Sequence, residues 1–184
     1  IKTSKKILKA TFGSLYFSQK MMTADTTDMH YLDFIFGLQE SLDETILGEN
    51  QFEFLLGDPN FKSILDEFWI PPYPDLEKLS KLPKGSLGWV YANNLINEGY
   101  TPDRILSIDP YPINSIKEFT IHRIWQTHDY IHALTGFDIN EIGEIGLLAF
   151  TFANTHSPVA QAAMTGALMR YAAGKSSDYR ETHS

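Results

Sequence analysis

The stretch SIKEFTIHRIWQTHDYIHALTG, residues 115–136, decides the fold of this chain. It opens with Ser115 and Glu118, a capping box in which a hydroxyl and a carboxylate satisfy backbone N–H groups at the start of a helix. It closes at Gly136, a residue type that commonly ends helices. These signals predict a helix over residues 116–135.

Two further helices are predicted directly after it. The segment Asp138-Ile139-Asn140-Glu141 is a weaker analogue of the capping box, and it predicts a helix that runs to about Thr155. Ser157 followed by Pro158 opens a third helix, which is expected to end near Gly174. Consecutive helices joined by short turns are typical of a helical bundle.

Upstream, apolar residues with a period near 3.6 predict helices over about 28–39, from Asp58-Pro59 to the prolines that begin at Pro71, and over 87–97. Residues 103–112 are predicted to be a connecting loop, with a short strand as the alternative. No segment alternates as a half-buried strand does. The chain is therefore predicted to be an all-α, single-domain helical bundle spanning residues 1–184, with a polar tail over 175–184.

Composition narrows the functional classes. The chain has no cysteine, which excludes disulfides and thiolate metal sites, and its net charge of -8 argues against a nucleic-acid partner. No stretch approaches the roughly twenty apolar residues of a transmembrane span. Residues 1–20 contain five lysines and no acidic residue, and they place Phe12, Leu15 and Tyr16 on one helical face. This segment is either a basic amphipathic helix at a membrane surface or a surface helix packed on the core.

Two histidines in the decisive stretch have the spacing of metal ligands. His128 and His132 are four residues apart, so their imidazoles project from adjacent turns of one helix face. Asp129 lies on the flank of that face, as a third ligand or as an acceptor that orients an imidazole. A short turn should bring the next helix back beside the pair, and Glu144 then becomes the remaining ligand, because Glu141 is suited to capping.

The sequence thus predicts one divalent metal between two consecutive helices, held by His128, Asp129, His132 and Glu144. Imidazole and carboxylate ligands suit zinc first, with magnesium, iron or manganese as alternatives. A single His pair falls short of the two Glu-x-x-His motifs of di-iron bundles. A zinc hydrolase is less favoured, because Asp129 stands where metallopeptidases use Glu as the base. The competing interpretation is that both histidines are core residues satisfied by hydrogen bonds.

Small residues recur on the third predicted helix. Ala160, Ala163 and Ala167 form a strip with Met164 nearby. Such a strip permits close helix packing. The alternative is an apolar groove with room for an isoprenoid tail.

The motif is specific enough to identify a resemblance. His128-Asp129-Tyr130-Ile131-His132, eleven residues, then Glu144 resembles the metal motif of the coenzyme Q biosynthesis protein four family. Residues 82–88 and 99–103 resemble the segments that precede this motif in the family.

The resemblance implies an all-α fold, a divalent metal usually given as zinc, and a homodimer. It implies removal of the C1 carboxylate from a polyprenylated 4-hydroxybenzoate intermediate by a metal-dependent carbon–carbon lyase, with Asp129 as the nearest candidate catalytic base. It also implies a polyprenyl lipid ligand and contacts with other quinone-biosynthesis proteins. The candidate lipid-binding residues are Ala160, Ala163, Met164 and Ala167. The expected location is the matrix face of the mitochondrial inner membrane or the cytoplasmic face of a bacterial membrane. A non-enzymatic lipid-binding scaffold for those enzymes is the alternative.

Overall fold

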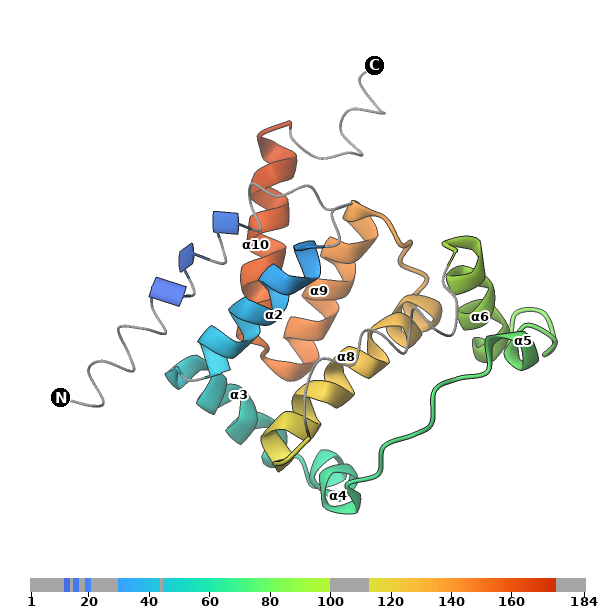
Figure 1. Ribbon diagram of the computed structural model, residues 1–184, viewed down its shortest axis with the longest axis horizontal. Helices are drawn as coiled ribbons and strands as arrows, with labels where there is room; N and C mark the ends of the chain where they lie inside the picture. The colour runs from blue at the N-terminus through green and yellow to red at the C-terminus, as the bar shows by residue number, and fades with distance from the viewer. Residues whose placement is uncertain are drawn as a thin grey trace. The chain divides into compact units, whose positions relative to one another are not determined.

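The computed structural model describes residues 12–13, 15–16, 19–20, 30–43, 45–99 and 113–174, and every regular element within these ranges is a helix (Figure 1). The all-α prediction is confirmed. The predicted loop at 103–112, the polar tail and most of residues 1–20 lie outside the described ranges. The helices are α2 His30–Asp43, α3 Ile46–Leu56, α4 Pro59–Glu67, α5 Leu76–Leu79, α6 Leu87–Asn97, α8 Ile116–Thr135, α9 Glu141–Thr155 and α10 Pro158–Ala172.

The chain divides into two compact units, residues 1–58 with 140–184 and residues 59–139. The first unit contains α2, α3, α9 and α10, in which α9 and α10 pack side by side and are joined by a tight turn, so they run antiparallel (Figure 1). Its core consists of Leu38 and Leu42 from α2 with Val159 and Ala163 from α10. Apolar burial of these side chains joins α2 to α10, two helices that are far apart in the sequence.

Helix α3 was not predicted from the sequence. Its buried residues are Gly48, Gln51 and Leu55 rather than an apolar stripe. A Cβ on Gly48 would come within 2.7 Å of the backbone at the end of α2. The glycine therefore permits the close approach that packs α3 against α2, and periodicity alone does not reveal it.

The second unit contains α4, α5, α6 and α8. Its buried apolar cluster consists of Leu76, Tyr91, Ala92 and Leu95, against which Tyr130 and Ala133 of α8 pack. Helix α6 has the predicted bounds, and α4 begins at the predicted Pro59 and ends at Glu67. A Cβ on Gly88 would lie 2.7 Å from the Leu82 side chain, so this glycine admits close packing within the segment 82–88.

The ends of the helices around residue 136 follow their capping residues. Ser115 Oγ accepts a hydrogen bond from the Glu118 N–H at 3.1 Å, and Gly136 ends α8 with a φ of +76°, both as predicted. At α9 the predicted cap was wrong. The N-cap is Asn140, whose side chain accepts from the Gly143 N–H at 2.8 Å, and not Asp138. Ser157 caps α10 as predicted, and that helix ends at Ala172.

None of the described helices combines the length and the apolar character needed to cross a lipid bilayer.

Candidate metal centre

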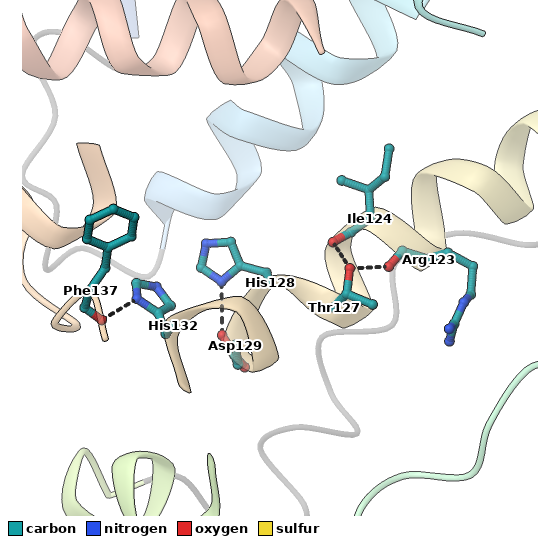
Figure 2. A network of polar contacts seen from close by, with 7 residues as sticks. All are labelled: Arg123, Ile124, Thr127, His128, Asp129, His132 and Phe137. Atoms are coloured by element: carbon teal, nitrogen blue, oxygen red, sulfur yellow. Dashed lines mark hydrogen bonds and ion pairs between the residues drawn. The ribbon is translucent and has the colours of Figure 1, made fainter. Parts of the chain in front are cut away.

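His128 and His132 lie on one face of α8, as their spacing predicts. Their ring centroids are 5.0 Å apart and the ring planes meet at 73° (Figure 2). His132 is 1% exposed, whereas the His128 side chain is 28% exposed. The pair therefore has one ring in the protein interior and one near the surface.

Each imidazole has an acceptor beside its Nδ1 atom. The Nδ1 of His132 lies 3.0 Å from the Phe137 carbonyl oxygen, and that of His128 lies 2.9 Å from Asp129 Oδ1 (Figure 2). A carbonyl oxygen only accepts, and an ionised carboxylate only accepts, so both Nδ1 atoms carry the proton in the neutral rings. Nε2 is then the unprotonated nitrogen of each ring, the state in which imidazole ligates a metal.

Asp129 lies beside His128, a placement that supports the orienting role of the two that its sequence position allowed. Its side chain is 43% exposed, and Oδ1 is directed at the His128 ring. A carboxylate that accepts from a ligating histidine fixes the ring orientation and raises its basicity.

Glu144 lies in the first turn of α9 and is half-buried. Within the described part of the chain, His128, His132 and Glu144 form a group that could hold a metal ion, and Asp129 is not a member of that group. A carboxylate in the first turn of a helix is also favoured by the partial positive charge of the helix N-terminus. The identity of the metal is not fixed by two imidazoles and one carboxylate.

Glu141 has a different role from the one its position suggested. It is the first residue of α9, and its Oε1 lies 3.5 Å from Nε of Arg170 in the last turn of α10. The two side chains are 6% and 9% exposed. The capping role assigned to Glu141 was therefore wrong, and sequence reasoning missed the pair because its members are 29 residues apart.

A tyrosine pair fixes α6 against α8. The rings of Tyr91 and Tyr130 are stacked with centroids 4.0 Å apart and planes within 5°. Burial raises the pKa of the Tyr91 hydroxyl above its ordinary value, and Tyr130 and the charge of Asp129 raise it further. Burial also raises the pKa of Tyr130, so both hydroxyls stay protonated at neutral pH. Tyr130 lies between the two histidines in the sequence, but nothing local indicates its partner.

The candidate lipid residues on α10 are partly explained by packing. Ala160 and Ala163 are 4% and 3% exposed, and Ala163 contacts the core that includes Leu38. Met164 and Ala167 are half-buried. A cavity of about 190 Å³ in the same unit is lined by other residues, namely Leu47, Asn50, Gln51, Phe152, His156, Pro158 and Gln161. Lipid binding by the α10 residues stays a prediction.

Comparisons with known proteins agree on one family. Residues 55–184 match the family model described as "Coenzyme Q (ubiquinone) biosynthesis protein Coq4". The chain is similar to proteins named ubiquinone biosynthesis protein COQ4, mitochondrial. The one from Phaeosphaeria nodorum is 38% identical over 85 residues, which are 46% of this chain and 29% of that protein. The one from Zygosaccharomyces rouxii is 34% identical over 122 residues, 66% of this chain and 34% of that protein.

A solved structure extends the similarity to nearly the whole chain. The crystal structure of a putative ubiquinone biosynthesis protein from Nostoc punctiforme superposes with a TM-score of 0.74 and 25% sequence identity. The match covers 93% of this chain and 78% of the other. By contrast, the chain spans only about a third of the length of the curated relatives it matches.

Proposed function

The chain belongs to the coenzyme Q (ubiquinone) biosynthesis protein Coq4 family, and on that premise we propose that it is a metal-dependent carbon–carbon lyase of ubiquinone biosynthesis. The substrate is a polyprenylated 4-hydroxybenzoate. The bond between ring carbon C1 and its carboxylate breaks, the electron pair stays on C1, carbon dioxide leaves, and a proton takes its place. The observation that carries the proposal is the oriented histidine pair, in which the Nδ1 atom of each ring lies within 3.0 Å of an oxygen acceptor.

His128, His132 and Glu144 are the proposed ligands, and Asp129 is the acceptor that positions His128. Only residues 136–140 connect α8 to α9, and His132 hydrogen-bonds back to Phe137 within that connection. His132 is one turn before the end of α8 and Glu144 is in the first turn of α9, so a short turn suffices to bring them to one ion.

The donor set fits a catalytic ion better than a structural one. Structural zinc sites are closed by four protein ligands, whereas catalytic sites such as His₂Glu have three and keep a position for substrate. When bound, the metal would supply Lewis-acid stabilisation of negative charge on the carboxylate or phenolate of the substrate. Asp129 then acts through His128 rather than as a base, since its Oδ1 is directed at that ring.

The membrane-surface interpretation of the N-terminal segment forms part of this proposal. Phe12, Leu15 and Tyr16 are 64%, 63% and 53% exposed, which supports an apolar face available to lipid. The Lys20 ammonium lies 5.6 Å over the Tyr16 ring, so a cation accompanies that face, as in helices that lie on anionic membranes. The names of the fungal relatives support a mitochondrial location, and the matrix face of the inner membrane is part of the proposal. Homodimerisation and assembly with other quinone-biosynthesis proteins stay predictions.

The test compares the wild type with a His128→Ala, His132→Ala double variant. Elemental analysis should find about one divalent metal per wild-type chain and none in the double variant. A His122→Gln variant is the matched control, because it changes another buried histidine of α8 that is outside the metal-binding group. It should keep its metal.

The activity assay follows release of labelled carbon dioxide from a carboxyl-labelled polyprenylated 4-hydroxybenzoate. We expect release by the wild type and the control only, with lipid binding retained in the double variant. Lipid binding without release by any variant would favour the scaffold function. A wild type that takes up no metal, even when metal is supplied, would refute the metal centre itself.

A further inference from the structure

A buried ion pair joins the beginning of α9 to the end of α10. Arg170 Nε lies 3.5 Å from Glu141 Oε1, and both side chains are less than a tenth exposed. Arg and Glu are rarely buried to this extent unless they are paired, and such pairs are a poor source of stability compared with apolar packing. The apolar core of this unit is built from α2 and α10 without either residue. The ion pair therefore has a structural role other than filling the apolar core.

The antiparallel packing of α9 and α10 brings opposite helix ends together. Glu141 is the first residue of α9 and Arg170 is in the last turn of α10. An anion at a helix N-terminus and a cation at a helix C-terminus both interact favourably with the helix dipoles. The first turn of a helix tends to fray. The ion pair ties this turn of α9 to α10, which Val159 and Ala163 hold in the core.

We propose that Arg170 is a positioning residue for Glu144, an inference that rests on the proposed function, in which Glu144 ligates the metal. Glu144 follows Glu141 by three residues, so the two project from the same side of the first turn. Asn140 also anchors this turn. Its side chain accepts from the Gly143 N–H at 2.8 Å and its carbonyl accepts from the Glu144 N–H at 2.8 Å.

Loss of the Arg170 charge would act on Glu144 through the backbone of this turn. Removal of the Arg170 cation disfavours the buried Glu141 carboxylate beside it, which then relaxes by moving toward water. That movement unwinds the first turn of α9 and displaces the Glu144 carboxylate. The expected consequence is weaker metal binding by a protein whose core is intact.

The experiment measures Zn²⁺ affinity by competition with a chromophoric chelator. Arg170→Met should weaken Zn²⁺ binding by about 10- to 100-fold, the range found when partners of metal ligands are changed. Arg170→Lys, which keeps the charge, should recover part of that loss. Val159→Ala is the matched control, because it destabilises the same unit at the opposite end of α10. It should lower the thermal midpoint and leave the Zn²⁺ affinity within about twofold.

A second readout does not depend on metal. Amide exchange at Gly143 and Glu144 should be faster in metal-free Arg170→Met than in the metal-free wild type, and unchanged in Val159→Ala. Unaltered Zn²⁺ affinity and exchange in Arg170→Met, or equal losses of Zn²⁺ affinity in Arg170→Met and Val159→Ala, would overturn the positioning role while leaving the metal centre standing. A wild type that does not bind Zn²⁺ would instead overturn the proposed function, and the inference with it.

Discussion

Replacing Asp129 by Ala removes the carboxylate that accepts from His128 Nδ1 at 2.9 Å. The His128 and Asp129 side chains are 28% and 43% exposed, so their interaction contributes little to folding. Partly exposed pairs of this kind are worth about 0–1 kcal/mol, and the free energy of unfolding of the metal-free protein should fall by no more than that. We expect the main effect on the affinity of the protein for the metal.

Without the acceptor, His128 can rotate and can carry its proton on Nε2, the atom that should ligate. Loss of such an acceptor typically weakens metal binding by 10- to 100-fold, which is about 1.4–2.7 kcal/mol. Asp129→Asn keeps an oxygen at the same distance and therefore keeps the tautomer. We expect the Asn variant to bind Zn²⁺ at most about tenfold more weakly than the wild type.

The assay is chelator competition for Zn²⁺, with urea unfolding of the metal-free variants as the control for stability. An Ala variant that binds Zn²⁺ as tightly as the wild type would refute the orienting role of Asp129. Complete loss of stoichiometric Zn²⁺ from both the Ala and the Asn variants would show that Asp129 is itself a ligand, the alternative that its sequence position also allows.

Three further changes test the two cores and a helix end. Leu38→Ala removes a side chain that is 0% exposed, and urea titration should show a loss of about 2–5 kcal/mol in unfolding free energy. Gly136→Ala meets no atom within 4 Å, so only the strain of a φ of +76° should count, about 1–2 kcal/mol in the same titration. Burial raises the folded-state pKa of Tyr91 above the value of about 10 in unfolded chains, so stability should fall as pH rises above about 10. Urea titrations at pH 9 and 11 should show a smaller fall in Tyr91→Phe.

Helix ends were predictable where the capping signal is local and unambiguous. Ser115 and Gly136 act within one turn of their own positions, and both act as predicted. The start of α9 was misplaced because Asp138 and Asn140 are both good caps. Asn140 caps in the structure, so Glu141 becomes the first helical residue and cannot complete a capping box. Because the N-cap was predicted at Asp138 instead of Asn140, Glu141 was wrongly assigned a capping role.

Helix α3 was missed for a different reason. Periodicity detects helices that bury apolar side chains along one stripe. In α3 the buried positions include Gly48 and Gln51, while Ile46, Leu47 and Phe54 are 44–65% exposed. The helix packs because Gly48 permits a close approach to α2. This contact depends on α2 as well as on the sequence of α3, so the α3 sequence alone does not reveal it.

In the candidate site, too, the features set by local sequence spacing were predictable, and the contacts between distant segments were not. The spacing of His128 and His132 fixes their common face, so that part was predictable from the sequence. The direction of the Asp129 side chain depends on its rotamer, so its contact with His128 could not be predicted from the sequence. The Arg170 and Tyr91 contacts join segments far apart in the chain, so no local pattern could indicate them.

The separate apolar clusters help to distinguish a structural from a catalytic role for a bound metal. Metal binding supplies the folding free energy of domains such as zinc fingers, which lack an adequate core. Here one unit buries Leu38, Leu42, Val159 and Ala163, and the other buries Leu76, Tyr91, Ala92 and Leu95. The Nδ1 atom of each imidazole lies beside an acceptor of the protein, so the chain itself orients two of the three proposed ligands. Because neither core depends on the ion, its charge remains available to a substrate carboxylate, which is the role the lyase proposal requires.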